Sequence, residues 1–476
     1  MTRVIEILKK NGPMLSGNLA EILQEKYNIS YEAARKAISR ASSPVHKLFT
    51  VKFDKRQYFI YLQEQFNSEE YLFNLIRAFE ACGKKYYQII KAIENNGGYI
   101  SKKMLASYVS APVDNLKGHK RYDLIVEKLI ELNLIEDFSD EYYKLMYFKD
   151  SSIKNSNAIE LAKKTVSEDF CDWAKKLNLI SYNSYKGFNQ SANFAKFQWG
   201  FTAPSYCISN YDKPSFIIGD IIIGIADIPD VQFFIDKICI INSFRNVHSF
   251  MPILLASEKF TDEAFHLLKK HGIICATIGN LFSNVYANSL RDLVYIVKNA
   301  SAIISNEPEK FVDYLSKISL LEGKMGNLVG DLFETCVGYY YSQIGCKYFE
   351  LKKIVNFKGQ KKEIDVYIEK DGIIKIIECK GIRGNIEIEY VTKWISENIP
   401  VIFKSLTQNR AGIEIEFELW VTGGFDVDTE KLLLESEQNT KKYTIRHLNR
   451  QDIEQLAKKS KNNVLINCIK SIFDRE

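Results

Sequence analysis

The segment at residues 363–381, EIDVYIEKDGIIKIIECKG, places carboxylates and an amine at spacings that suit a divalent cation. Asp365 lies in one apolar run, and Glu378 and Lys380 lie two positions apart in the next. Two converging carboxylates repel each other unless a cation lies between them, and Mg2+ prefers oxygen ligands. A neighbouring lysine can orient or deprotonate a water, or stabilise negative charge on a phosphate. The same E-x-K pattern also occurs on ordinary edge strands of proteins rich in Lys and Glu.

The backbone that must position these residues is predicted to be a β-hairpin. The apolar runs 364–368 and 373–377 flank Asp371-Gly372, a pair typical of tight hairpin turns. Because side chains alternate along a strand, Glu378 and Lys380 share one face and Cys379 points to the other. The hairpin is therefore expected to bring Asp365 close to this pair, and the Cys379 carbonyl is a further candidate oxygen ligand for a metal ion.

A helix is predicted before the hairpin. Leu328, Leu332, Val337 and Tyr341 recur at helical spacing, and Glu334 falls on the same segment. After the hairpin we expect a strand at 417–422, a helix at 428–437 and a strand at 443–447.

This order of elements resembles the PD-(D/E)XK nuclease superfamily, which has the restriction-endonuclease-like fold and includes the Mrr-type nucleases. The motif positions are Glu334, Asp365 and Glu378-Cys379-Lys380, with Ile364 where the family usually has proline. The resemblance covers roughly residues 320–455. E-x-K carries little information by itself, so the assignment depends mainly on the order of helix and strands.

The resemblance implies a metal-dependent endonuclease that hydrolyses phosphodiester bonds in DNA. Asp365, Glu378 and the Cys379 carbonyl would bind Mg2+, with Mn2+ as an alternative. Glu334 would orient a water or bind a second ion, and Lys380 would position the attacking water or neutralise developing charge. Cleavage of both strands requires two active centres, so a homodimer or a partner subunit is expected. A role in restriction or bacterial defence follows from the family.

The first 66 residues are predicted to form a winged helix-turn-helix domain. Three helices, the third capped by Ser30, precede strands at 47–53 and 57–62. Eleven Lys and Arg stand against six Asp and Glu in this region, which suits double-stranded DNA. The third helix would enter the major groove, and the wing would contact phosphates. An alternative is a winged helix that docks on protein. The candidate DNA-binding residues are Arg35, Lys36, Arg40, Lys55 and Arg56.

Residues 67–150 resemble a second winged-helix module. Helices are expected at 72–81, 86–94 and 122–132, with a shorter one around Met104, and strands at 134–138 and 142–147. Acidic residues slightly outnumber basic ones here, so scaffolding or dimer formation is an alternative to DNA contact.

Residues 151–300 are predicted to form an α/β domain, and 301–476 the nuclease domain. In the former we expect a helix at 158–177, strands at 216–225, 237–242, 252–255 and 273–278, and a helix at 261–270. The distal part resembles Mrr-type nucleases, which suggests a degenerate nuclease-like fold, because the expected E-x-K strand reads Ile240-Ile241-Asn242-Ser243. An unrelated α/β sheet is the alternative. Helices are expected at 289–320, and one long final helix at 453–473.

Composition limits the class of protein. A chain of 476 residues with 46% hydrophobic residues supports several packed domains, that is, winged-helix α+β modules followed by α/β domains with a mixed sheet flanked by helices. The net charge of +5 permits binding to nucleic acid. Nine cysteines without a C-x-x-C pair argue against zinc ribbons and disulfide scaffolds, and indicate a reducing cytoplasm. The longest apolar run, at 216–228, contains two aspartates and is too short to span a bilayer, so no membrane association is expected.

Two other functions compete with a DNA endonuclease. One is a DNA-binding regulator or scaffold in which the nuclease-like fold only binds. The other is a structure-selective or RNA nuclease with the same metal chemistry. The chain has no G-x-x-x-x-G-K-[ST] phosphate loop, so an ATP-driven step would require a separate protein.

Overall fold

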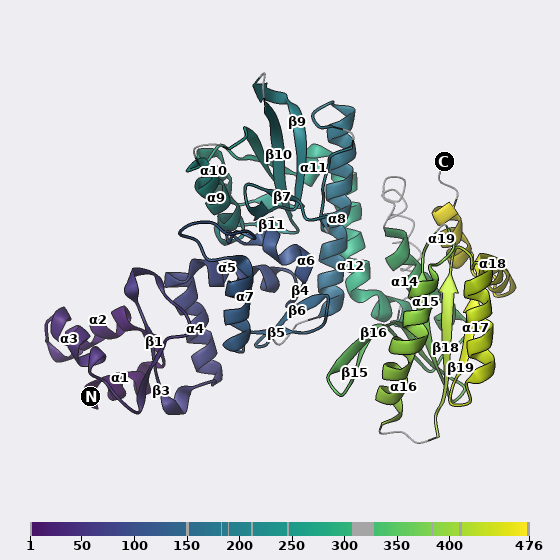
Figure 1. Ribbon diagram of the computed structural model, residues 1–476, viewed down its shortest axis with the longest axis horizontal. Helices are drawn as coiled ribbons and strands as arrows, with labels where there is room; N and C mark the ends of the chain where they lie inside the picture. The colour runs from purple at the N-terminus through teal and green to yellow at the C-terminus, as the bar shows by residue number, and fades with distance from the viewer. Residues whose placement is uncertain are drawn as a thin grey trace. The chain divides into compact units, whose positions relative to one another are not determined.

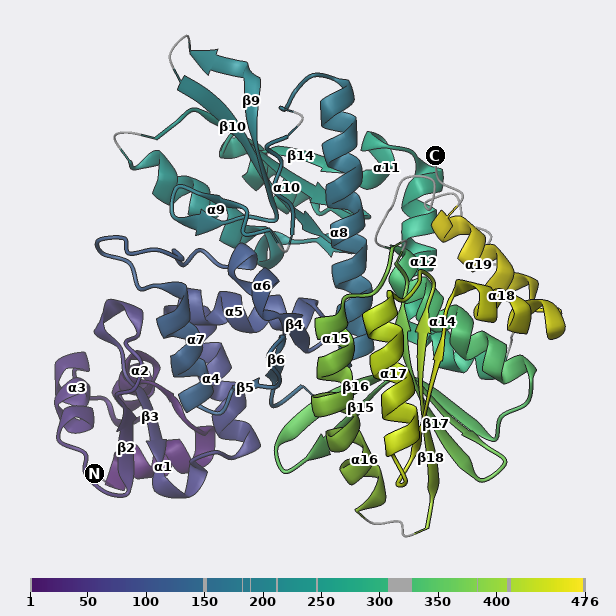
Figure 2. The ribbon, with the colours of Figure 1, turned by 45° about the vertical axis from the view of Figure 1, so that its right-hand side comes forward.

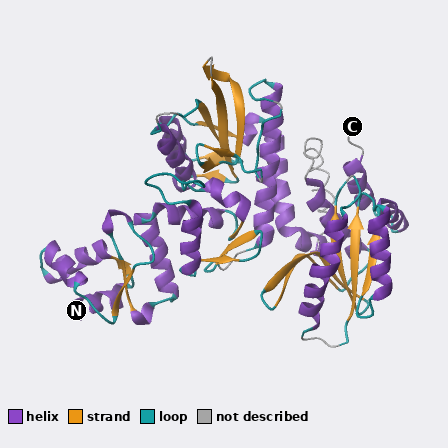
Figure 3. Ribbon diagram, viewed as in Figure 1, coloured by secondary structure: helices purple, strands orange, loops and turns teal. Residues whose placement is uncertain are grey.

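The computed structural model describes residues 2–148, 152–181, 183–188, 190–210, 213–244, 247–306, 328–382, 384–408 and 412–473. The chain has a mixed α/β, multidomain architecture with several small sheets and one five-stranded mixed sheet (Figures 1 and 3). It divides into two compact units. Unit 1 comprises Met1–Ser156 and Ala174–Thr277, and unit 2 comprises Asn157–Trp173 and Ile278–Glu476.

The first part of unit 1 combines three helices with a three-stranded antiparallel sheet of order β1-β3-β2. All three predicted helices are confirmed, including the cap, where Ser30 accepts a hydrogen bond from Ala33 N at 3.2 Å. Their apolar faces pack on the sheet around Leu8, Leu19 and Ile60, which are fully buried. The elements are α1 Thr2–Asn11, β1 Met14–Leu15, α2 Ser16–Tyr27, α3 Tyr31–Ser39, β2 Val45–Leu48 and β3 Phe59–Leu62.

The strand predicted at 47–53 is wrong in its extent. Strand β2 ends at Leu48, and the chain continues as a loop with a 3-10 turn, η1, at Asp54–Arg56. Phe53 lies outside the sheet and stacks on Phe79, with ring centroids 5.3 Å apart. Burial of this aromatic ring on the neighbouring helix therefore outweighs continued strand pairing.

The second part of unit 1 repeats this composition, with helices around a small antiparallel sheet of order β4-β6-β5. The predicted helices and both predicted strands are present, and β4 is an additional strand. The elements are α4 Glu69–Cys82, α5 Lys84–Asn95, β4 Tyr99–Ser101, α6 Lys102–Leu105, η3 Ala106–Tyr108, α7 Tyr122–Glu131, β5 Ile135–Asp137 and β6 Tyr142–Leu145.

The rest of unit 1 contains a four-stranded sheet of order β14-β12-β10-β9. Strand β9 is antiparallel to β10, whereas β10, β12 and β14 run parallel to one another. The predicted helices at 158–177 and 261–270 are confirmed as α8 and α10. Helix α8, Ile153–Lys176, belongs to both units, because residues 157–173 lie in unit 2. The other elements are β7 Asn193–Phe194, β8 Phe197–Gln198, β9 Phe201–Asn210, β10 Lys213–Ile222, β11 Ile225–Ala226, α9 Ile228–Asn242, β12 Phe250–Ala256, β13 Lys259–Phe260, α10 Asp262–Lys270 and β14 Ile274–Thr277.

The strand predicted at 237–242 is wrong, because these residues form the end of helix α9. Asp227 and Asp230 form a reciprocal capping box at its start, and Pro229 lies in its first turn. Both features favour a helix start over a strand. Within the apolar run at 238–241, Ile238 and Ile241 are buried and Cys239 is exposed, as the period of a helix dictates.

Helix α9 carries a lysine that is sealed inside unit 1. Lys237 Nζ lies 3.8 Å from Asp220 Oδ2 on β10, and neither side chain is exposed to solvent. The ammonium also donates to the Gln198 carbonyl at 2.8 Å and lies 4.7 Å from the Trp199 ring centroid. Burial lowers the pKa of Lys237 to about 8, and the Asp220 carboxylate opposes this shift. At pH 7 the pair is therefore a buried ion pair.

Unit 2 is built on a five-stranded sheet of order β15-β16-β17-β18-β19. Strands β15, β16 and β17 are consecutively antiparallel, and β17, β18 and β19 are parallel. The predicted hairpin and both later strands are confirmed, whereas β15 was not predicted. The strands are β15 Tyr348–Phe357, β16 Gln360–Lys370, β17 Ile373–Lys380, β18 Glu414–Val421 and β19 Thr444–Leu448.

Helices cover both faces of this sheet. One face is covered by α15, the π-helical turn that follows it, and α17, which Figure 2 shows in front of the strands. These elements contribute Val391, Trp394 and Leu433 to the core. On the other face, Tyr341 of α14 donates to Glu418 Oε2 at 2.7 Å. The helical elements of unit 2 are α11 Ile278–Leu281, α12 Asn284–Asn306, α14 Leu328–Gln343, α15 Ile388–Lys393, η4 Trp394–Asn398, α16 Ile399–Thr407, α17 Val427–Asn439, α18 Arg450–Lys459 and α19 Asn463–Phe473.

The single final helix predicted at 453–473 is wrong, because α18 and α19 are separate. Lys461, between them, has φ +55°, which breaks the helix. Helix α19 packs against α14, so the expected packing on the sheet domain is present. The helices predicted at 289–320 are represented by α12, and residues 307–320 lie outside the described residues.

The sheets of the two units share a pattern of strand directions. In each, an antiparallel hairpin, β9–β10 or β16–β17, is followed by two strands parallel to its second member. Helices connect these later strands in both units. No helix in the described part of the chain is long and apolar enough to cross a membrane.

Replacing Asp220 by asparagine is expected to destabilise unit 1, because Lys237 would retain a buried charge without its carboxylate. The expected loss in the free energy of unfolding is about 3 kcal/mol at pH 7. Denaturant titration followed by tryptophan fluorescence measures it, since Trp199 lies against the ammonium. The double variant Asp220→Asn/Lys237→Met removes the charge and should recover most of the loss. Additive losses in the double variant would contradict coupling between the two side chains.

Candidate active site

The hairpin β16–β17 brings the predicted carboxylates together. The pairing of β16 with β17 runs from Lys370↔Ile373 to Val366↔Ile377, and Asp365 and Glu378 are the next residues on the two strands. Opposite residues of an antiparallel pair lie on the same face of the sheet. Both side chains are largely buried, at 8% and 9% exposure.

Asp365 is held in place by the backbone of the facing strand. Cys379 N donates to Asp365 Oδ2 at 2.8 Å, which fixes the carboxylate. Burial raises the pKa of Asp365 well above its ordinary value, and the neighbouring carboxylates Glu378 and Glu334 raise it further, whereas Lys380 opposes them. The negative charge of Asp365 is therefore costly in the metal-free protein.

Glu378 is held by two donors. Lys380 Nζ lies 3.1 Å from Glu378 Oε1, and the hydroxyl of Tyr390, from α15, donates to the same oxygen. Burial by itself would lower the pKa of Lys380, but Glu378 and Asp365 raise it above its ordinary value. Lys380 is therefore an ammonium group that can stabilise negative charge, which disfavours its predicted alternative use in deprotonating a water.

Tyr390 was missed by the sequence analysis. The Lys380 ammonium lies 4.7 Å from its ring centroid, so Tyr390 contacts both members of the E-x-K motif. Burial and then Glu378 raise the pKa of Tyr390, which keeps the hydroxyl protonated as a donor. The sequence carries no signal for this contact beyond a tyrosine in a helix that follows the strand.

Glu334 reaches the same region from α14, since its charge contributes to the raised pKa of Asp365. Lys352, on β15, lies 3.4 Å from Glu334 Oε2, and the two side chains are only 13% and 15% exposed. Lys352 was also missed, because β15 was not predicted. The charge of Glu334 therefore acts on Asp365, and a second lysine, Lys352, faces Glu334.

The residues of this site have the chemistry that a hard divalent cation requires, but they do not form a complete set of metal ligands. Asp365 and Glu378 offer oxygen donors whose mutual repulsion a cation would relieve. Among the residues that the structure describes, however, no three His, Cys, Asp or Glu side chains are placed to hold a metal ion together. Glu378 instead contacts Lys380 and Tyr390, so a metal ion would have to compete with these contacts.

The position of Cys379 is defined through its backbone N–H, which donates to Asp365. Burial, followed by the charge of Asp365, raises the pKa of the Cys379 thiol well above its ordinary value. The thiol therefore stays protonated and is a poor metal ligand. Metal binding by its carbonyl oxygen remains a prediction.

The predicted DNA-binding residues are exposed. Arg35 and Lys36 belong to α3, Arg40 follows its last residue, and Lys55 and Arg56 belong to the turn η1. These residues belong to unit 1, whereas Asp365 and its neighbours belong to unit 2. Exposure permits contact with DNA but does not distinguish it from contact with another protein.

Comparisons with known proteins add little to this geometry. No family model matches the chain, and no curated protein matches it. Among solved structures, the restriction endonuclease FokI bound to DNA is weakly similar, with a TM-score of 0.16 and 11% sequence identity over 62% of this chain and 68% of that chain. A TM-score this low lies far below that of proteins sharing a fold, so the site has to be judged by its own residues.

Asp365→Asn is expected to stabilise the metal-free protein at pH 8. The pKa of Asp365 is higher in the folded protein than in the unfolded chain. The folded protein therefore loses stability as the pH rises from the lower of these two pKa values through the higher one. Asparagine removes this cost, and its Oδ1 can still accept the Cys379 N–H. A gain in the free energy of unfolding is therefore expected at pH 8, and it should shrink toward pH 4.

Thermal denaturation in the presence of a chelator, at both pH values, measures this difference. The control Asp428→Asn, at an exposed position on α17, should change stability by less than about 0.5 kcal/mol. A lower stability of Asp365→Asn at pH 8 would show that the carboxylates do not repel each other as inferred.

Proposed function

We propose that the chain is a metal-dependent endonuclease that hydrolyses phosphodiester bonds in DNA. The observation that carries the proposal is the convergence of Asp365, Glu378 and the Lys380 ammonium at the end of the β16–β17 hairpin. The order α14, β16, β17, β18, α17, β19 also supports the restriction-endonuclease-like fold that the motif implies. A role in restriction or defence against foreign DNA follows from that resemblance.

In this proposal Asp365 and Glu378 hold Mg2+ or Mn2+, with the Cys379 carbonyl as a further ligand. The bound cation would supply charge stabilisation for the phosphate and activate a water. Glu334 orients that water, and Lys380 lies where an ammonium can stabilise charge that develops on the phosphate. The Cys379 N–H keeps Asp365 turned toward the site.

Unit 1 is proposed to bind double-stranded DNA. Its first two parts each combine helices with a three-stranded sheet, as winged helix-turn-helix modules do, and the first carries the exposed cations of α3 and η1. The sheet β14-β12-β10-β9 is proposed to be a degenerate nuclease-like domain, because its directions match those in unit 2. Its acid and lysine, Asp220 and Lys237, are sealed from solvent.

Cleavage of both strands of a duplex requires two active centres, so the proposal includes a homodimer or a partner subunit. A non-catalytic DNA-binding scaffold is the second candidate. It is favoured by the contacts that Glu378 makes with Lys380 and Tyr390, which occupy the carboxylate without a metal ion.

Asp365→Ala and Lys380→Ala are each expected to reduce Mg2+-dependent cleavage by about 100-fold or more, because each removes a charge that the reaction needs. Purified variants are incubated with supercoiled, linear and branched DNA, and with RNA, in Mg2+ or in chelator. Lys393→Ala, an exposed lysine of α15, serves as the control and should retain activity.

Cleavage that survives both substitutions would rule out this active site. If the wild-type protein binds DNA but never cuts it under these conditions, the scaffold becomes the better function.

The double variant Arg35→Ala/Arg40→Ala is expected to bind duplex DNA more weakly and with a flatter salt dependence. If both side chains neutralise phosphates, the slope of log K against log salt should fall by roughly 1.8. Fluorescence anisotropy at several salt concentrations measures this slope. Lys269→Ala/Lys270→Ala removes the same charge from the exposed end of α10 and is the control. Equal effects of the two variants would reassign α3 to protein contacts.

A further inference from the structure

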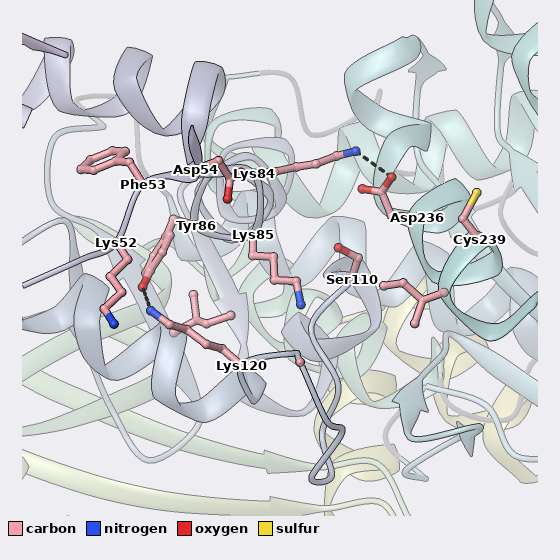
Figure 4. A pocket seen from close by; sticks show the side chains of 14 residues that line it. Lys52, Phe53, Asp54, Lys84, Lys85, Tyr86, Ser110, Lys120, Asp236 and Cys239 are labelled. Carbon is pink, nitrogen blue, oxygen red and sulfur yellow. Dashed lines mark hydrogen bonds and ion pairs between the residues drawn. The ribbon is translucent and has the colours of Figure 1, made fainter. Parts of the chain in front are cut away.

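A cavity of about 500 Å3 lies within unit 1, and all of its lining residues belong to that unit (Figure 4). Its walls come from the loop that follows β2, the first turn of α5, the segment before α7, and α9. A volume of this size falls in the range of pockets for small ligands. The site is therefore large enough for one mononucleotide-sized molecule.

Lysines dominate the charge of this cavity. Lys52, Lys84, Lys85 and Lys120 all line it. Lys84 is paired with Asp236 at 2.7 Å, as the dashed line in Figure 4 marks. The other three form no ion pair with any described carboxylate, which leaves a net positive lining.

The two acidic residues of the lining do not cancel this charge. Asp236 accepts hydrogen bonds from Gln88 at 2.8 Å and Gln232 at 2.9 Å as well as from Lys84, so its oxygens are already occupied by donors. Asp54 is exposed, and water screens its charge.

Lys85 and Lys120 are each oriented by a neutral partner. Lys120 Nζ donates to the Tyr86 hydroxyl at 2.9 Å. Lys85 Nζ lies 3.1 Å from His119 Nδ1, which can accept this hydrogen bond only when the ring is neutral. These contacts hold the ammonium groups without neutralising them, as a binding site for an anion requires.

The backbone and the aromatic wall point to the same ligand chemistry. Helix α5 begins at this cavity, has no acidic residue in its first turn and receives no side-chain cap from Gly83. Its positive end therefore adds to the lysines. Phe53 and Tyr86 line the same space beside the cations, although most of each side chain is buried and both rings stack on Phe79. Cations beside an aromatic wall suit a phosphate attached to a planar base.

We propose that this cavity binds the phosphate of a nucleotide, through Lys85 and Lys120, with the base against the aromatic wall. The nucleotide is either a free molecule or the phosphorylated end of a DNA strand, since both present the same group. This site is separate from the proposed nuclease centre and does not depend on it.

The full chain carrying Asp365→Ala is used for the test, so that DNA is not cut. Isothermal titration calorimetry measures the binding of ATP, of inorganic phosphate and of a short 5′-phosphorylated single strand. The parent protein is compared with variants that also carry Lys85→Gln or Lys120→Gln. Each substitution is expected to weaken binding by about tenfold, because each removes a charge-assisted hydrogen bond. Lys120→Arg keeps the cation and should retain binding within about threefold.

Lys103→Gln, at an exposed position on α6 outside the cavity, is the matched control and should bind as tightly as the parent. Thermal denaturation of every variant shows that the fold is intact. Binding of ATP that depends on Lys85 and Lys120 supports the site with a free nucleotide as its ligand, and binding of only the phosphorylated strand supports it with a strand end. No binding of any probe at millimolar concentration, or equal weakening by Lys103→Gln, would overturn the proposal.

Discussion

The antiparallel register between β16 and β17 is the constraint on which the candidate site depends. Asp371 and Gly372 form the turn with φ values of +53° and +85°, which suit the twist of a two-residue hairpin. This register puts Asp365 and Glu378 one step beyond the last pair, Val366↔Ile377, and the N–H of Cys379 fixes the Asp365 carboxylate. A slip of one residue would send Asp365 to the other face of the sheet, so the site exists only in this register.

Lysines face largely buried carboxylates at several places in the described chain, and three of these pairs differ in solvent access. Lys237 and Asp220 are completely sealed, and Lys375 and Glu418 are 16% and 2% exposed. Lys380 is 31% exposed, so its ammonium can meet an incoming anion while Glu378 stays largely buried. Two of these lysine–carboxylate pairs therefore lie inside a core. In the third, at the end of β17, the ammonium of Lys380 is accessible to a substrate.

The errors of the sequence analysis have a common physical origin. The apolar residues at 238–241 suit a buried strand and a buried helix equally, and the capping box at Asp227 decides for the helix. The long C-terminal helix breaks at Lys461, where a positive φ interrupts an otherwise helical pattern. The periodicity of apolar residues cannot choose between a strand and a helix, or between one helix and two. Packing and helix-end interactions, whose free energies are of similar size, decide between them.

The sequence by itself determined the hairpin, the shared face of Glu378 and Lys380, and the helix that carries Glu334, because turn chemistry and side-chain alternation act over a few residues. Only the tertiary structure decided what surrounds these groups. Tyr390 from α15 and Lys352 from β15 reach the carboxylates across the fold, and neither contact leaves a mark in local sequence. The energetic state of the site depends on these long-range neighbours, since burial and nearby charge set how strongly each carboxylate is held.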